Sequence, residues 1–174
     1  MADAKHLKSA IERNIKALKL RPSKGRGTAT TTVKVRSGVT CDIEDGGWKL
    51  VADQGPGDGG EDLGPDPGVF GRAALGSCLA MGYAIWASHL DVTLDSVEVV
   101  VEADYNAVGM YAIDDSVRPG WGAVRYAVKI SSDAPEERVR EVIEFADRHS
   151  PLLDDFGHPL SVTRELQITA PVRK

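Results

Sequence analysis

The side chain best suited to chemistry in this sequence is the thiol of Cys78, near the middle of the apolar stretch from Pro67 to His89. A cysteine attacks as its thiolate, and that form needs a nearby cation and a route to solvent. Arg36 and Arg72 are the candidate cations. Without such a partner, a cysteine in an apolar helix is a small, inert packing residue. Cys41 lies in a short predicted strand beside polar residues, where we expect no reactivity.

The other polar residues form no recognisable catalytic or metal site. Neither the cysteines nor the histidines have the spacing of metal ligands, so the sequence predicts no metal and no cofactor. The acidic, glycine-rich segment 54–67 lacks the alternating carboxylates of a calcium loop and the Gly-Lys-Ser/Thr of a phosphate-binding loop. Ser77 and Ser150 have no recognisable His-Asp pairing. Any catalysis is therefore expected at Cys78.

The helix that must position Cys78 is apolar on every side. Residues 73–87 carry no charge, and a helix of this kind must be buried. At 1.5 Å per residue it would be roughly 30 Å long, about the diameter of a small domain. One sheet and one amphipathic helix can hardly cover it from all sides. We therefore expect a closed twofold homodimer.

The rest of the chain predicts an α+β fold around this helix. Residues 4–20 have the apolar spacing of a surface helix, which ends at Arg21-Pro22. The alternating or extended segments that we expect to form strands are 28–36, 39–43, 48–52, 96–105, 122–131 and 160–170. A second helix begins near Asp133 with an early proline and ends at Pro151. After the leading helix, the expected order is βββ-α-ββ-α-β.

The composition predicts one domain with neither a nucleic-acid nor a membrane partner. A chain of 174 residues is long enough for one core, and its net charge of −5 argues against nucleic acid, which needs a basic face. The uncharged part of the apolar stretch is shorter than the roughly 20 residues of a bilayer span. No secretion signal and no disulfide framework are evident, so we expect reduced thiols and a cytoplasmic location.

Several sequence features together resemble the OsmC/Ohr family of thiol-dependent hydroperoxide reductases. They are the element order, the Gly-Pro-Asp-Pro turn at 64–67, the Gly-Ser-Cys-Leu-Ala core at 76–80 and the later helix ending in Ser-Pro at 150–151. The resemblance covers about residues 28–170. It implies an OsmC-like domain over 26–174 after an N-terminal helical extension over 1–25. It also implies an intertwined dimer, in which the long central helices of both subunits pack between sheets.

The same resemblance assigns roles to particular residues. It implies that Cys78 attacks the peroxide and that an arginine of the first hairpin, best matched by Arg36, stabilises the thiolate. It further implies a glutamate that pairs with this arginine and a resolving cysteine, but these two places hold Gly68 and Ser150. If the fold is that of the family, Ser150 should face Cys78. The carboxylates that could replace the glutamate are Glu61, Asp62 and Asp66.

We therefore expect reduction of organic hydroperoxides by a single cysteine, with an external thiol as reductant, in defence against oxidative stress. Because the facing helix carries no second thiol to condense with a sulfenic acid at Cys78, the family's two-cysteine cycle cannot be carried over. The alternative is a non-catalytic dimer of the same fold that binds or senses a small hydrophobic or electrophilic molecule. A purely structural module is the third possibility.

Overall fold

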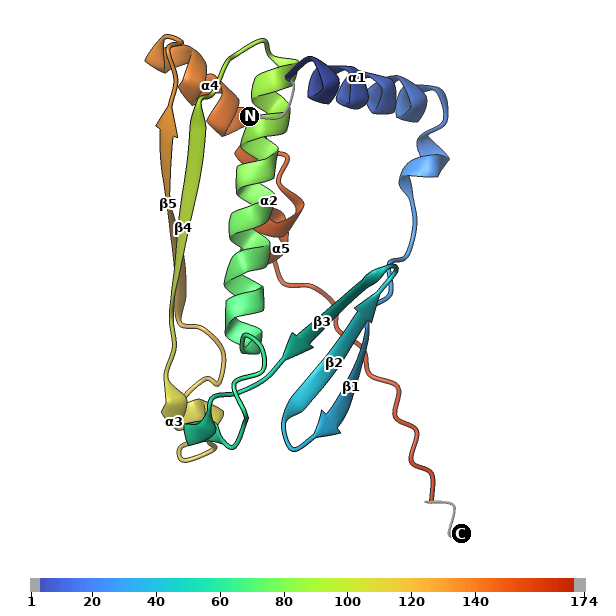
Figure 1. Ribbon diagram of the computed structural model, residues 1–174, viewed down its shortest axis with the longest axis vertical. Helices are drawn as coiled ribbons and strands as arrows, with labels where there is room; N and C mark the ends of the chain where they lie inside the picture. Colours follow the sequence, from blue (N-terminus) through green and yellow to red (C-terminus); the bar gives the residue numbers. More distant parts are fainter. Residues whose placement is uncertain (1–3, 171–174) are drawn as a thin grey trace.

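A long helix, α2 (Pro67–His89), runs along the middle of the molecule, with the other elements around it (Figure 1). The computed structural model of the protein describes residues 4–170. The Asp66 side chain caps the helix by accepting hydrogen bonds from the backbone N–H groups of Gly68 and Val69. Pro67 follows at the first helical position, where its fixed φ and missing N–H suit a helix start. The predicted bounds of this helix are confirmed.

The core lies between α2, a two-stranded sheet and α4 (Glu136–Asp147). Strands β4 (Ser96–Asp104) and β5 (Ala123–Ser131) pair antiparallel along their whole length. Alternate residues of each strand are half-buried, the period-two pattern of a sheet with one wet face. The fully buried side chains with the largest volumes are Tyr83, Leu75, Leu79 and Val142.

A second antiparallel sheet stands apart from this core (Figure 1). It consists of β1 (Thr32–Ser37), β2 (Thr40–Asp45) and β3 (Trp48–Ala52) in that order. Its two tight turns use Gly38 and Gly46 at φ 54° and 55°, a conformation that favours glycine. Most of its side chains are exposed. The meander predicted from the sequence is therefore present, but within one chain it hardly contacts the core.

Within residues 4–170, three further α-helices and two 3-10 helices lie around this core. Helix α1 (Ala4–Leu20) is followed by a 3-10 turn, η1 (Pro22–Gly25), and the loop before α2 holds another, η2 (Pro56–Asp58). The short helices α3 (Ala107–Met110) and α5 (Pro151–Gly157) were not expected. The division into an extension over 1–25 and a domain over 26–174 stays a prediction, and residues 1–3 and 171–174 lie outside the described part.

Two predictions for the C-terminal part are wrong in detail. Pro151 does not simply end the second helix: α4 ends at Asp147, and Pro151 opens α5. The closing strand over 160–170 does not form, and this segment is extended and exposed. Its side chains alternate as a strand requires, but a strand also needs the backbone of a neighbouring edge. The described chain offers none to this segment.

The expectation that α2 is buried on every side is also not met within one chain. The buried residues are Leu75, Leu79, Tyr83, Ala87 and Ser88, whereas Met81 on the opposite face is 59% exposed. By length and composition alone, α2 could cross a membrane. In the structure, one face of this helix packs against β4 and α4.

The loop between β3 and α2 is organised by one buried carboxylate. Asp53 is 2% exposed and accepts hydrogen bonds from the backbone N–H groups of Gln54, Glu61 and Leu63. Burial alone would raise the pKa of Asp53, but these three hydrogen bonds, together with one from the Thr40 side chain, outweigh it and lower the pKa. Gly60 is required here, because a Cβ would lie 1.9 Å from the Gln54 carbonyl oxygen.

We predict that Asp53→Asn lowers the melting temperature by several degrees at pH 7, because one carboxylate oxygen is replaced by a donor. A carboxyl whose folded-state pKa is lowered stabilises the fold above its unfolded pKa and loses this effect as the pH falls through the folded value. The difference from wild type should therefore shrink below about pH 4. Thermal unfolding of wild type and Asp53→Asn at pH 7 and pH 3 measures this difference. An equal difference in melting temperature at both pH values would contradict the stabilising role of the Asp53 carboxylate.

Candidate active site

The thiol of Cys78 lies against the hydroxyl of Ser150. The Sγ–Oγ distance is 3.5 Å, within hydrogen-bond range for sulfur, and either atom can be the donor. Cys78 is half-buried on α2, whereas Ser150 is only 6% exposed. These residues lie 72 positions apart in the sequence. The expectation that Ser150 faces Cys78 is confirmed.

The position of the Ser150 hydroxyl follows from the local sequence. Ser150 is the N-cap of α5, and its Oγ accepts a hydrogen bond from the Leu153 N–H at 3.4 Å. Pro151 at the first helical position completes a common helix-start pattern. Because Oγ accepts from Leu153, its own proton remains available for the sulfur of Cys78. The hydroxyl is therefore suited to donating a hydrogen bond to a thiolate or a sulfenate.

The half-buried carboxylate of Asp147 links the elements of the site. The Tyr83 hydroxyl donates to Asp147 Oδ1 at 2.7 Å, and the Tyr126 hydroxyl donates to Oδ2 at 3.1 Å. These bonds join α2 and β5 to the end of α4. Asp147, which accepts both bonds, lies three residues before Ser150. Burial, followed by the contact with Asp147, raises the pKa of Tyr83 far above its usual range and also raises that of Tyr126. Both phenols therefore remain protonated donors.

These three residues carry no recognisable signal in the sequence. Asp147 has the same helical spacing as many exposed carboxylates, and neither tyrosine stands in a motif. Their relation arises only when α2, α4 and β5 pack together. No signal in a single sequence could have identified them.

Aromatic rings and imidazoles pack beside this cluster. Trp86 lies edge-on to Phe145, with ring centroids 4.8 Å apart, and Phe145 stacks on His149 at 4.3 Å. The His149 Nδ1 lies 2.7 Å from the Phe145 carbonyl oxygen, and His89 packs on the other side of Trp86. Among the described residues, no group of histidine, cysteine and carboxylate side chains could hold a metal ion.

Gly68, at the place where the resemblance implies a glutamate, lies beside Arg72. A Cβ at Gly68 would lie 3.3 Å from Arg72 Nη1, and a Cβ at Gly71 would lie 2.7 Å from the Trp121 ring. The small residues thus admit the indole against α2. Arg72 also lines, with Ser77, Val99 and other residues, a cavity of about 300 Å³ between α2 and β4. The guanidinium of Arg72, the one arginine of α2, therefore lies beside position 68.

The structure of one chain does not bring Arg36 to Cys78. The Arg36 guanidinium pairs with Asp42 at 3.4 Å, and both side chains are about half exposed on the separate sheet. The role of Arg36 as the cation beside the thiolate stays a prediction. Of the three possible replacement carboxylates, Asp66 is engaged as the cap of α2, and Glu61 and Asp62 lie exposed in the preceding loop.

The two thiols occupy different parts of the fold. Both are free, and the Cys41 Sγ on β2 lies 3.6 Å from the Val39 carbonyl oxygen. Cys78 alone has a hydroxyl partner from another helix. A sulfenic acid at Cys78 would have the Ser150 hydroxyl within hydrogen-bond distance, and Ser150 could not convert it to a disulfide because it carries no thiol.

Comparisons with known proteins agree with this fold. A family model described as OsmC-like protein matches residues 57–165. A search of curated proteins finds no match to the sequence. Among solved structures, an OsmC-like protein from Mycoplasma pneumoniae superposes with a TM-score of 0.64 at 13% identity, covering 75% of this chain and 88% of its own.

Two further structures are organic hydroperoxide resistance proteins. The one from Legionella pneumophila has a TM-score of 0.54 and 16% identity, covering 74% of this chain and 88% of its own. The one from Elizabethkingia anophelis, with thiocyanate bound, has a TM-score of 0.55 and 16% identity over 74% and 87%. At these identities, the structural likeness shows the shared fold.

We predict that Ser150→Cys forms a disulfide with Cys78 when peroxide is added. The Sγ–Oγ distance of 3.5 Å shows that the two side chains are directed at each other, as a disulfide requires. The product should be about 2 Da lighter, with the two cysteine peptides linked on mapping. Ser116→Cys, on an exposed loop, is the matched control and should form no bridge. Oxidation of Cys78 without a bridge to position 150 would contradict the observed apposition.

Proposed function

The chain belongs to the family of OsmC-like proteins, whose model matches well over half of its length. On this basis we propose that it reduces organic hydroperoxides through Cys78 alone, with an external thiol as reductant. A peroxide-related role agrees with the family and with structural neighbours described as hydroperoxide resistance proteins. The single observation that supports the mechanism most strongly is the contact between Cys78 and Ser150.

In the first step, the Cys78 thiolate attacks one oxygen of the hydroperoxide. An S–O bond forms while the O–O bond breaks, and its electron pair leaves with the alkoxide, which takes a proton and becomes an alcohol. The sulfur is oxidised by two electrons to a sulfenic acid. The Ser150 hydroxyl, already at hydrogen-bond distance from the sulfur, steadies this state.

The second half of the cycle needs two equivalents of a small thiol. The first attacks the sulfenic sulfur, releases water and leaves a mixed disulfide on Cys78. The second attacks this disulfide, releases the oxidised reductant and restores the Cys78 thiol. Because Ser150 holds the place of a resolving cysteine, the mixed disulfide must be resolved from solvent. Cytoplasmic thiols suit this requirement.

The active unit that we propose is a homodimer. The side chains exposed along α2 include Val69, Ala73, Ser77 and Met81, an uncharged stripe opposite the buried face. The C-terminal segment keeps exposed apolar side chains at alternate positions, including Leu160, Val162, Leu166 and Ile168. A second copy that covers the stripe and pairs with this segment would satisfy both features. It would also let Arg36 of one copy approach Cys78 of the other.

The alternative is that the protein binds or senses a small hydrophobic or electrophilic molecule without turnover. The observation in its favour is Ser150 itself, since a thiol without a resolving partner is also what a one-step sensor requires. Turnover with an external thiol distinguishes the two functions.

We predict that Cys78→Ser abolishes consumption of cumene hydroperoxide in the presence of a small thiol, whereas Cys41→Ser keeps the wild-type rate. The physical reason is that, of the two thiols, Cys78 has a hydroxyl partner, Ser150, that can stabilise its oxidised form. The rate of peroxide loss over many turnovers measures the activity of each variant. Intact mass of the wild type, treated with peroxide in the absence of the thiol, should show one added oxygen. A single oxidation without turnover would favour the sensor, and an inert Cys78 would contradict both functions.

We predict that Arg36→Ala lowers kcat/KM for the hydroperoxide at least about tenfold, because a cation no longer stabilises the thiolate and the leaving oxygen. Lys34→Ala, two residues earlier on β1, is the matched control and should have little effect. If Arg72→Ala lowers kcat/KM and Arg36→Ala does not, the assignment of Arg36 is wrong and Arg72 provides the positive charge.

A further inference from the structure

Helix α1 has an apolar stripe that its own chain covers only in part. The stripe consists of Leu7, Ala10, Ile11, Ile15 and Leu18. No residue of α1 is fully buried, and the Leu18 side chain remains 43% exposed. An amphipathic helix gains its stability mainly from packing of its apolar face. The apolar side chains of this stripe would therefore be more stable if another surface packed against them.

The contacts that hold α1 to α2 lie near its first two turns. The Ser88 hydroxyl donates to the Ala4 carbonyl oxygen, and Lys8 Nζ lies 2.6 Å from the Asp91 carboxylate. Even there, a cavity of about 450 Å³, lined by Leu7, Ala84 and other residues, remains between the helices. From this attachment, α1 extends away from the β4–β5 sheet, on the side of α2 where β1–β3 also projects (Figure 1).

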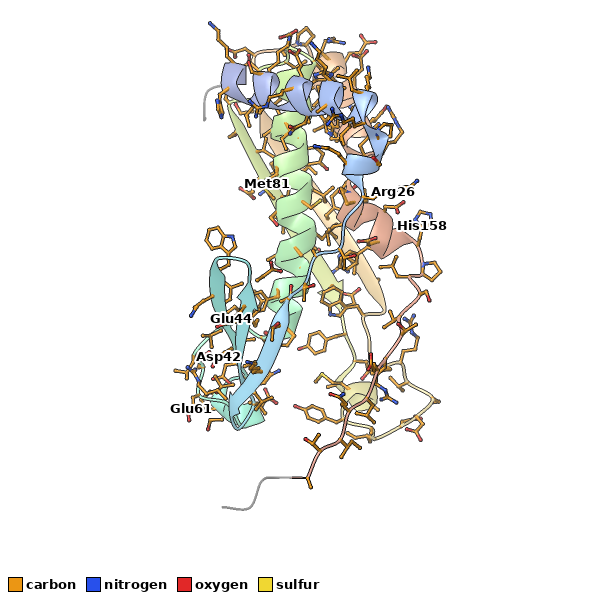
Figure 2. All side chains as sticks on the ribbon, turned by 90° about the vertical axis from the view of Figure 1, so that its right-hand side faces the viewer. Arg26, Asp42, Glu44, Glu61, Met81 and His158 are labelled. Atoms are coloured by element: carbon orange, nitrogen blue, oxygen red, sulfur yellow. The ribbon has the colours of Figure 1, made fainter. Side chains whose placement is uncertain are left out.

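The two ends of the molecule carry opposite charge. Residues 4–26 hold eight lysines and arginines against one glutamate, a formal charge of +7 in a chain whose total is −5. Residues 41–66 hold eight acidic residues against one lysine, a formal charge of −7. Figure 2 shows Asp42, Glu44 and Glu61 together at the β1–β3 end, remote from α1.

Charge complementarity selects one arrangement of two copies. If their α2 helices pack antiparallel about a twofold axis, the basic end of each copy meets the acidic end of the other. A parallel arrangement would bring like charges together, which costs free energy.

We propose that α1 is a dimer clasp: its apolar stripe packs on a second copy of the chain, and its lysines and arginines face that copy's acidic segment 41–66. This inference rests on the homodimer proposed above. A basic amphipathic helix can also bind an anionic membrane. The second copy is favoured because the Leu7, Ile11 and Ile15 side chains are already half-buried toward the protein and because the chain itself supplies an acidic surface.

The apolar part of the clasp is tested by the dissociation constant of the full-length dimer, measured by sedimentation and mass photometry on dilution. Ile15→Asp, on the stripe, should raise this constant at least about tenfold, since it buries a charge at the interface. Ser9→Asn, on the exposed face of α1 opposite the stripe, changes no charge and should leave it nearly unchanged. Circular dichroism checks folding, and Ile11→Ser is the milder second variant.

The charged part is tested by charge exchange. Glu61→Lys with Asp62→Lys should weaken the dimer, and adding Lys16→Glu with Lys19→Glu in the same chain should restore it. A simple loss of folding would not be rescued in this way.

The outcomes separate this inference from the proposal on which it rests. A wild type that is monomeric at micromolar concentration overturns the homodimer and the clasp together. A wild-type dimer that Ile15→Asp leaves intact overturns the clasp alone. Co-sedimentation of the wild type with phosphatidylglycerol vesicles, abolished by Ile15→Asp while the dimer is unaffected, overturns the clasp in favour of a membrane surface.

Discussion

The burial of α2 is the constraint on which the rest of this structure depends. Its inner face, with Leu75, Leu79 and Tyr83, holds the β4–β5 sheet and α4 together as one core. Its outer face has no charged residue over 73–87 and remains largely uncovered in one chain. The separate β1–β3 sheet and the unpaired C-terminal segment are likewise exposed and have few contacts with the core of one chain. Each gains a partner if a second copy packs along α2.

The same helix determines the chemistry, because Cys78 lies where α2 meets the start of α5. The Tyr83–Asp147–Tyr126 cluster links α2 to the end of α4 and so restricts where Ser150 can lie. A hydroxyl at this place can donate a hydrogen bond to a thiolate or a sulfenic acid at Cys78, but it cannot form a disulfide with it. The proposed function follows from this geometry: Cys78 would carry out the first step, and an external thiol would be needed for the second.

Local sequence rules predicted much of this arrangement. Pro67 and the Asp66 cap mark the start of α2, and alternation of valines and charged residues marks β4, so these elements could be placed in advance. The apposition of Ser150 and Cys78 followed from the family resemblance. The closing strand could not be predicted correctly, because strand formation depends on an available edge as well as on alternation. The tyrosine–carboxylate cluster depends on packing between three elements, which a single sequence does not encode in any local pattern.

The central claim is that Cys78 is a reactive thiolate rather than a packing residue. The most direct measurement is the rate at which iodoacetamide alkylates Cys78 as a function of pH, in a Cys41→Ser background that leaves one thiol. We expect Cys78 to be alkylated near neutral pH faster than a free cysteine, because the thiolate is the reacting form. A rate near neutral pH equal to or below that of a free cysteine would contradict the claim.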